Sequence, residues 1–536
     1  GGVAPVGLAT VTANFADNFT GGSYGADGAG TTAFTLKLTG SNVASGLFAL
    51  DAADKTAGDG DGIGQGAQIV LNQAGNVITG SAGGTTYFTI TIDPATGIVT
   101  FAETKNIWHP DANNSDDAAT LTTAAGLLQL VKTITDADGD SVATTLDLGN
   151  GVFSIQDDGP AQGRVLDVQK DTLVLDESAV GTDTVGGIAP VGLASVTADY
   201  SNNFSPVNYG TDGAGTTTYK FELSAANVGS GLYALDAADK TAGDGDGIGQ
   251  GSQILLSQTP DGVIHGMVGA VEYFTISVDG SGIVTFTQVK NIWHPDTNNS
   301  DDAATLTTPA LGDLKLTQTV TDADGDHTSA SINLGGNVFT IQDDGPAVPT
   351  VTAAADTLVL DESAVGTDTV GGIAPVGLAS VTADYSNNFS ASNYGTDGAG
   401  ATTYKFELNG ANIGSGLYAL DAADKSAVDG DGIGQGSQIL LSQTPDGVIH
   451  GMVGAVEYFT ISVNGSGIVT FTQVKNIWHA DPNNSDDAAT LTTALAGDLK
   501  LTQTVTDADG DHTSASINVG TGVFTIQDDG PAVPTV

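Results

Sequence analysis

The sequence predicts an all-β protein made of three tandem β-sandwich domains in an elongated array. Three observations support this fold class. The chain repeats itself: Trp108, Trp293 and Trp478 lie 185 residues apart (293 − 108 = 478 − 293 = 185), with similar residues around each. Within a repeat, hydrophobic and polar residues alternate with a period of two, as from Thr218 to Leu223, which is typical of half-buried strands. The 74 glycines fit a turn-rich β chain and show no strict period, so collagen is excluded.

Length and composition restrict the function. A chain of 536 residues should hold about three to four domains. With 14 Lys and Arg against 63 Asp and Glu, its net charge is -49, which argues against nucleic acid or an anionic membrane as a direct partner. Hydrophobic residues make up 40% of the chain and charged residues only 14%, so it can bury a core. There is no cysteine, and no apolar run long enough to cross a membrane.

The repeats divide the chain into three expected domains, at residues 1–163, 164–349 and 350–536. The joints between them, at residues 161–164 and 347–350, are short, and long Gly/Ser linkers that would let the domains tumble do not occur. Repeats 2 and 3 open with Leu-Val-Leu-Asp-Glu-Ser, and repeat 1 has no such segment. We therefore expect repeat 1 to lack its first strand and the chain to be part of something longer.

Turn residues separate the predicted strands of repeat 2 in order. Thr259–Gly262 forms a turn in which Pro presets φ and Gly takes a positive φ. Residues 274–289 predict a hairpin whose turn is Asp279–Gly282. A second hairpin pairs residues 314–321 with 327–334 around the loop at 322–326. Roughly ten short strands per repeat fit a β-sandwich, and helix is confined to one turn, at most, near residues 235–240.

The loop Asp-Ala-Asp-Gly-Asp occurs once in each repeat. Three carboxylates in five residues repel one another, and Lys and Arg are nearly absent nearby. Oxygen ligands without cysteine indicate a hard ion, and Ca²⁺ is the natural choice. The loop is not an EF-hand, because its Gly is at the fourth position and Asn333 stands where Glu is required. A polar hairpin turn is the alternative. The predicted ligands are Asp136, Asp138, Asp140, Asp322, Asp324, Asp326, Asp507, Asp509 and Asp511.

The motif Ile-Gln-Asp-Asp-Gly-Pro ends each repeat. An Asp-Glu pair follows shortly after the start of repeats 2 and 3. Because the linker is short, we expect carboxylates of the hairpin loop, the strand end and the next domain to converge on one ion and stiffen the joint. An ordinary linker is the alternative. The predicted ligands are Asp157, Asp158, Asp343, Asp344, Asp528 and Asp529, with Asp176, Glu177, Asp361 and Glu362.

A glycine-rich loop contributes a third acidic motif, Gly-Asp-Gly-Asp-Gly in repeat 2. It resembles a Gly/Asp calcium loop, but no tandem nonapeptide of the β-roll type follows it, and a long flexible turn explains the same residues. The predicted ligands are Asp59, Asp61, Asp244, Asp246, Asp429 and Asp431.

The stretch from Trp293 to Asp302 places His294 near Asp and Ser. No Gly-x-Ser-x-Gly or His-Glu-x-x-His motif accompanies it, and an enzyme rarely needs three near-copies of its site, so we predict no catalysis. We expect Trp293 to pack against the sandwich, and Asn299, Asp301 and Asp302 either to form a turn or to bind a further ion.

These motifs together resemble the tandem extender domains of giant RTX adhesins, surface proteins of Gram-negative bacteria exported by type I secretion. The resemblance rests on Leu-Val-Leu-Asp-Glu-Ser, Val-Thr-Asp-Ala-Asp-Gly-Asp and Ile-Gln-Asp-Asp-Gly-Pro, and covers nearly the whole chain. It implies immunoglobulin-like β-sandwiches, calcium at the joints and a stalk that projects a distant binding tip. By motif position it assigns calcium ligation to Asp322, Asp324, Asp326, Asp343, Asp344 and their copies. A membrane anchor, a binding tip and a C-terminal β-roll are not recognisable in this chain.

The expected function is therefore a calcium-stabilised extender of an extracellular adhesin on a Gram-negative cell surface. Its expected partners are neighbouring repeats of the same longer chain and other copies in a filament, with no nucleic acid and no direct membrane insertion. The alternative is a set of calcium-dependent carbohydrate-binding repeats that use Trp293 or Asn299.

Overall fold

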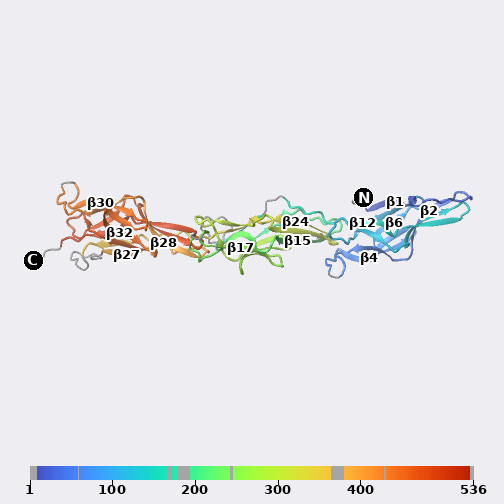
Figure 1. The fold of residues 1–536 in the computed structure, drawn as a ribbon, viewed down its shortest axis with the longest axis horizontal. Coiled ribbons are helices and arrows are strands. Elements are labelled where there is room, and N and C mark those ends of the chain that lie inside the picture. Colours follow the sequence, from blue (N-terminus) through green and yellow to red (C-terminus); the bar gives the residue numbers. More distant parts are fainter. Residues whose placement is uncertain are drawn as a thin grey trace.

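The computed structural model describes residues 9–57, 60–166, 171–178, 194–241, 245–363, 379–427, 430–495 and 497–531. These residues form three lobes arranged end to end along one axis, one lobe for each repeat (Figure 1). Helix is limited in these ranges to short 3-10 turns such as Ser201–Asn203. The predicted fold class, an all-β chain of three tandem immunoglobulin-like β-sandwich domains in an elongated array, is confirmed.

Each repeat contains one seven-stranded antiparallel sheet. In repeat 2 its order is β14-β20-β19-β18-β17-β16-β21. The strands in repeat 1 are β1 (Thr10–Asn14), β7 (Ile98–Glu103), β6 (Thr85–Ile92), β5 (Val77–Ala82), β4 (Gln65–Ala74), β3 (Val43–Leu50) and β8 (Ile107–Trp108). In repeat 2 they are β14 (Ser195–Asp199), β20 (Ile283–Gln288), β19 (Val271–Val278), β18 (Ile264–Val268), β17 (Gln250–Gln258), β16 (Val228–Leu235) and β21 (Ile292–Trp293). In repeat 3 they are β27 (Ser380–Asp384), β33 (Ile468–Gln473), β32 (Val456–Val463), β31 (Ile449–Val453), β30 (Gln435–Gln443), β29 (Ile413–Leu420) and β34 (Ile477–Trp478).

Two smaller sheets complete each repeat. The first contains the acidic hairpin, and in repeats 2 and 3 it lies toward the preceding lobe (Figure 1). It comprises β2 (Thr31–Leu38), β10 (Leu128–Thr135) and β11 (Ser141–Asp147), then β15 (Ala214–Leu223), β23 (Leu314–Asp322) and β24 (His327–Asn333), then β28 (Ala399–Leu408), β36 (Leu499–Asp507) and β37 (His512–Asn518). The second comprises β9 (Ala118–Thr122) and β12 (Asn150–Gln156), then β13 (Leu173–Asp176), β22 (Ala303–Thr307) and β25 (Gly336–Gln342), then β26 (Leu358–Asp361), β35 (Ala488–Thr492) and β38 (Thr521–Gln527).

The alternating pattern of the sequence places one face of each strand in a core. Phe274 of β19 and Phe286 of β20 are fully buried, and their ring centroids lie 5.6 Å apart. Phe286 also contacts Phe339 of β25 at 5.2 Å, so aromatic packing joins the large sheet to the second small sheet. Gly266 is required beside this cluster, because a Cβ there would lie 2.4 Å from the Phe274 ring. The buried hydrophobic residues form three separate clusters, one per repeat.

The strand that opens repeat 2 pairs differently from the others. β13 runs parallel to β25, with Leu173 opposite Phe339 and Asp176 opposite Gln342. β26 pairs with β38 in the same way in repeat 3. The chain therefore enters a repeat alongside the strand by which it leaves, and both strands run toward the following repeat.

Candidate metal centre

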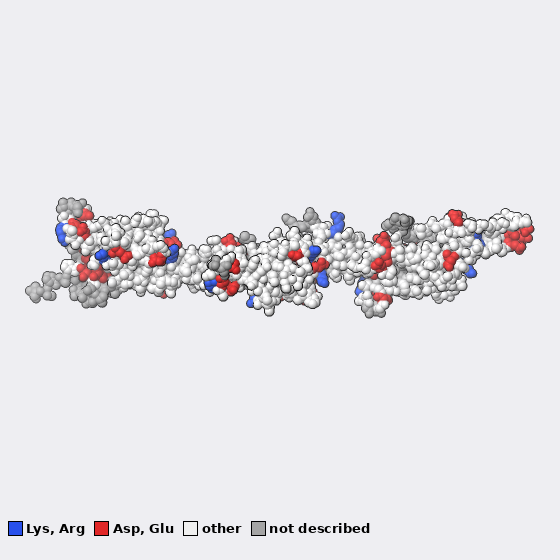
Figure 2. Space-filling model, viewed as in Figure 1, with Lys and Arg blue, Asp and Glu red and all other residues white. Residues whose placement is uncertain are grey.

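Acidic side chains gather at the two joints between lobes and at both ends of the rod, while the sides of the lobes carry few charges (Figure 2). The hairpin loop between β23 and β24 lies at the start of repeat 2, and the residues after β12 lie at the end of repeat 1. Each joint is therefore built from two different repeats.

The first joint brings together Asp157 of repeat 1 with Asp212 and Asp324 of repeat 2. One oxygen of each lies within 4.8 Å of the others. All three residues are buried, at 7%, 8% and 4% exposure. The backbone N–H of His109 donates to Asp324 Oδ2 at 3.3 Å, and the Asn106 side chain donates to Asp212 Oδ1 at 2.6 Å. Repeat 2 thus docks its loop onto the end of repeat 1.

The second joint repeats this geometry. Asp302 and Asp343 of repeat 2 meet Asp511 of repeat 3 with oxygens within 4.8 Å of one another. The backbone N–H of His294 donates to Asp509 Oδ2 at 3.3 Å, and Asn291 donates to Asp397 Oδ1 at 2.7 Å. The joint is therefore a repeated structure and not a property of one linker.

Many oxygens at these joints are buried without a hydrogen-bond partner in the described portion of the chain. Both carboxylate oxygens of Asp157 and of Asp343 belong to this group. Other such oxygens include one each on Asp176, Glu177, Asp212, Asp302, Asp322, Asp324, Asp326, Asp397, Asp507, Asp509 and Asp511. Buried anions are tolerated in proteins when they are paired or coordinate a metal. The donor set consists of carboxylates, which suits a hard cation that takes six to eight oxygens, such as Ca²⁺.

The pKa values of the joint carboxyl groups reflect their burial and their repulsion of one another. Burial first, and then the neighbouring Asp326, Asp212 and Asp324, raise the pKa of Asp157 to about 11. Burial and Asp324 raise the pKa of Asp322 to about 8. The pKa of Asp343 is raised strongly by burial and by Asp397. Without a cation, each joint therefore holds more negative charge than its surroundings stabilise.

The predicted grouping of ligands is wrong in one respect. We expected the hairpin loop to meet the closing motif of its own repeat and the Asp-Glu pair of the next. Instead, the loop of repeat 2 meets Asp157 of the preceding repeat. The Asp-Glu pair lies at the far end of its own repeat, where the Glu177 N–H donates to Gln342 O at 2.9 Å. The parallel pairing of β13 with β25 carries Glu177 there.

Several predicted ligands take other positions. Asp344 accepts hydrogen bonds from Thr396 N at 2.7 Å and Ser178 Oγ at 3.2 Å, so it ties repeat 3 to repeat 2. In repeat 1, Asp136 and Asp138 form a group with Asp27 at the outer end of the lobe. Two further predicted ligands accept hydrogen bonds: the Asp158 carbonyl from Thr211 N at 3.3 Å, and Asp529 from Ser363 Oγ at 3.3 Å. Asp140 is exposed, whereas Asp176 and Asp361 are buried beside Gln342 and Gln527. Glu362 lies with Asp528 at the end of repeat 3.

The glycine-rich loop also belongs to the joint. A Cβ at Gly64 would lie 2.3 Å from the Ala323 carbonyl of the next repeat, so this close approach requires glycine. Asp61, Asp246 and Asp431 are exposed in this loop, whereas Asp59, Asp244 and Asp429 lie outside the described residues. Metal binding by the loop remains a prediction.

Two kinds of site residue were missed from the sequence. Asp212 and its copies Asp27 and Asp397 occur in Tyr-Gly-x-Asp-Gly-Ala-Gly, a recurring motif that carried enough signal to be noticed. His294 was considered only for catalysis. Its ring is fully buried and lies between Asp302 and Glu177. Burial, the largest influence, lowers its pKa, but the two carboxylates together outweigh burial and raise that pKa to about 10.

Trp293 packs edge-on against Tyr233, with ring centroids 6.0 Å apart, and donates from Nε1 to the Ile248 carbonyl at 2.9 Å.

None of the helical segments in the described ranges has the length and apolar character needed to span a bilayer.

Comparisons with solved structures find other repeat proteins. One is the tetra-tandem repeat in the extending region of a large adhesion protein, with 12% identity, 94% of this chain and 68% of that chain covered, and a TM-score of 0.14. Another is a Ca²⁺-stabilised adhesin that helps an Antarctic bacterium reach out and bind ice, with 15% identity, 92% and 99% coverage, and a TM-score of 0.18. A third is protocadherin gammaB7 EC3-6, with 10% identity, 92% and 77% coverage, and a TM-score of 0.18. At such TM-scores, none of these likenesses assigns a function.

No curated protein matches the chain. The model of one family, a domain of unknown function designated DUF5801, matches residues 5–149, 172–335 and 357–520. These three matches cover most of the sequence, one in each repeat. The chain therefore belongs to the DUF5801 family and contains three consecutive copies of its domain.

Proposed function

We propose that this chain is a calcium-stiffened extender segment of an extracellular bacterial adhesin, holding a distant binding region away from the cell surface. The observation that carries the proposal is the convergence, at both joints, of buried carboxylates from two successive repeats. A cation between Asp157 and Asp324, or between Asp343 and Asp511, would bind both repeats at once. It would thereby fix the angle between them.

The sequence motifs support the proposed route of export and the proposed partners. The resemblance to RTX extender repeats supports export by type I secretion from a Gram-negative cell, a role in biofilms, and neighbouring repeats of a longer chain as partners. Millimolar calcium outside the cell would occupy the joints, whereas low free calcium inside would leave the repeats loosely connected.

A second candidate function has one observation in its favour. A cleft of about 160 Å³ at repeat 3 is lined by Tyr418, Trp478 and Asp487, an aromatic and acidic combination that suits a sugar. Its volume is below the roughly 300–1,000 Å³ of typical ligand pockets, so carbohydrate binding ranks second. A glycan array in calcium separates the two functions, because an extender gives no signal on it.

Small-angle X-ray scattering of the whole chain tests the main proposal. In millimolar calcium we expect the scattering of one extended rod, and we expect its maximum dimension to increase as calcium is added. After chelation, the scattering should become that of three domains on flexible joints. Identical scattering curves in calcium and in EDTA would overturn the proposal, because the joints would then be held by packing alone.

A further inference from the structure

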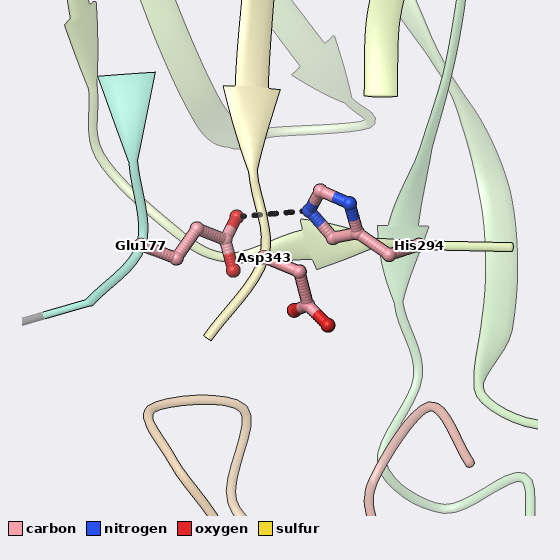
Figure 3. A group of neighbouring side chains, drawn as sticks. All are labelled: Glu177, His294 and Asp343. Carbon is pink, nitrogen blue, oxygen red and sulfur yellow. Dashed lines mark ion pairs between the residues drawn. The ribbon is translucent and has the colours of Figure 1, made fainter. Parts of the chain in front are cut away.

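A second cluster, made of residues from a single repeat, lies inside each of repeats 2 and 3; in repeat 2 it shares Asp343 with the joint. In repeat 2 it consists of Glu177, His294 and Asp343, whose ligand atoms lie within 4.8 Å of one another. Figure 3 shows Glu177 and His294 facing each other, with Asp343 between them on the segment that follows β25. They follow the ends of β13, β21 and β25 respectively, so the cluster gathers three strand ends of one repeat.

The imidazole of His294 has no hydrogen-bond partner within the described ranges, although its side chain has 0% exposure. Its Nε2 lies 3.8 Å from Glu177 Oε1. This is too long for a hydrogen bond, which spans about 2.7–3.2 Å. Two atoms that ligate the same ion at about 2.0–2.2 Å lie about 3.3–3.6 Å apart at a tetrahedral angle. The separation in repeat 3, from His479 Nε2 to Glu362 Oε1, is 3.6 Å.

The other ring nitrogen faces a carboxylate in every repeat. His294 Nδ1 lies 3.4 Å from Asp302 Oδ1, His479 Nδ1 lies 3.7 Å from Asp487 Oδ1, and in repeat 1 His109 Nδ1 lies 3.0 Å from Asp117 Oδ1. Only the His109 contact is short enough for a hydrogen bond. In repeats 2 and 3, Asp302 and Asp487 lie on the side of the ring from which a carboxylate commonly orients a metal-binding histidine, with Nε2 on the other side. Nε2 faces Glu177, so either a proton on Nε2 or a metal ion bound by both side chains would neutralise this pair.

Asp343 has two oxygens for two sets of neighbours. Both are buried without a hydrogen-bond partner in the described portion of the chain. One set is Glu177 and His294 of its own repeat, and the other is Asp302 with Asp511 of the next repeat. The second set contains only oxygen ligands and suits calcium. The first includes an imidazole, which calcium rarely takes and which zinc, copper, iron and nickel prefer.

We propose that Glu177, His294 and Asp343 bind a divalent transition-metal ion such as Zn²⁺, and that Glu362, His479 and Asp528 form the same site in repeat 3. Repeat 1 has no counterpart of Glu177 in this sequence, so the chain holds two complete sets. The ion fastens the end of the opening strand to the end of the closing strand. Because all three ligands come from one repeat, the site does not need a neighbouring repeat.

Equilibrium dialysis of the full chain against ZnCl₂ in millimolar calcium, followed by metal analysis, tests the proposal. We expect His294→Gln to lower the bound zinc by one ion per chain, and His294→Gln with His479→Gln to lower it by two. The matched control is His265→Gln, which replaces a partly buried histidine that pairs with Glu272 on the side of the same repeat. It should bind as much zinc as the parent chain. Cobalt substitution should give visible absorption that disappears with the same variants.

Two further measurements make the outcome decisive. Glu177→Gln keeps an acceptor for the Ile292 N–H, which donates to Glu177 Oε1 at 2.9 Å, yet removes the charge, so it should lose zinc while remaining folded. Equal zinc binding by the parent and all variants, or no zinc beyond an adventitious ion, would overturn the proposal. The calcium-induced rise in melting temperature should persist in His294→Gln. Its loss would count against the calcium joint instead, so the two ideas fail separately.

Discussion

Replacing Asp343 by Asn should stabilise the chain without calcium and reduce the stabilisation that calcium provides. Asn has nearly the same shape but carries no charge. Asp343 is 1% exposed, and its two oxygens lack hydrogen-bond partners among the described residues. An uncompensated buried charge costs about 3–5 kcal/mol. In EDTA we therefore expect Asp343→Asn to stabilise the chain, by about 1–3 kcal/mol if some of that cost is relieved.

In calcium the same change removes a ligand that faces both repeats. A hundredfold loss of calcium affinity corresponds to about 2.7 kcal/mol of lost stabilisation. For domains of this size, 1 kcal/mol shifts the melting temperature by about 2–4 °C. Scanning calorimetry should therefore show a calcium-induced rise in melting temperature that is about 5–11 °C smaller than that of the parent, together with a higher melting temperature than the parent in EDTA.

The matched control is Asp528→Asn, at the same position in repeat 3. In a fragment of residues 1–536, no residues after Val536 are present to supply counterparts of Asp397 and Asp511, so in this fragment Asp528 cannot share a calcium ion with a following repeat. We expect it to change the calcium-induced shift much less. The reasoning would be refuted if both variants changed that shift equally, or if Asp343→Asn destabilised the chain in EDTA as much as in calcium.

Three other outcomes follow from the joints. For the parent chain, melting temperatures in EDTA and in millimolar calcium should differ by more than about ten degrees, because several sites bind only the folded state; coincident melts would contradict this. Electron microscopy in calcium should show a rod with a length on the order of 150 Å, estimated from about 3.3 Å per strand residue. The double variant Asp343→Ala with Asp344→Ala should add a bend between repeats 2 and 3. A compact three-lobed particle would argue for a shared cleft instead. In EDTA, the melting temperature should fall as pH rises from about 5 to about 8. Burial and Asp324 raise the pKa of Asp322 to about 8, so over this range the folded state holds a proton that the unfolded state has released, and the folded state loses stability as pH rises; a melting temperature that rises with pH in EDTA would contradict the sign.

The sequence was enough to predict the fold class and most of the acidic residues at the joints, because these depend on local signals. Alternation specifies strands, and Asp-Ala-Asp-Gly-Asp specifies a tight acidic hairpin wherever it occurs. Which carboxylates meet depends on long-range pairing. The four-residue strand before Glu177 carries no signal for parallel pairing with a strand more than 160 residues later, so the Asp-Glu pair was assigned to the wrong joint.

The histidine cluster was hidden for a different reason. His294 and Glu177 are 117 residues apart (294 − 177 = 117), and neither lies in a motif with metal-ligand spacing. Their proximity results from three strands ending at the same edge of the sandwich, which only the assembled repeat makes visible. Asp212 could have been found from the sequence, because its Asp-Gly motif recurs with the same 185-residue interval as the tryptophans.

The parallel pairing of β13 with β25 has a mechanical consequence. Tension along the rod enters repeat 2 before Leu173 and leaves it after Gln342, at opposite ends of two adjacent strands. Pulling these points apart slides one strand along the other, so the hydrogen bonds between them are loaded together in shear. In strands joined by a hairpin and pulled from their open end, the hydrogen bonds would instead break singly and in sequence. Repeats 2 and 3 are therefore arranged to resist stretching from their two ends, which is the load that the proposed extender role would place on them.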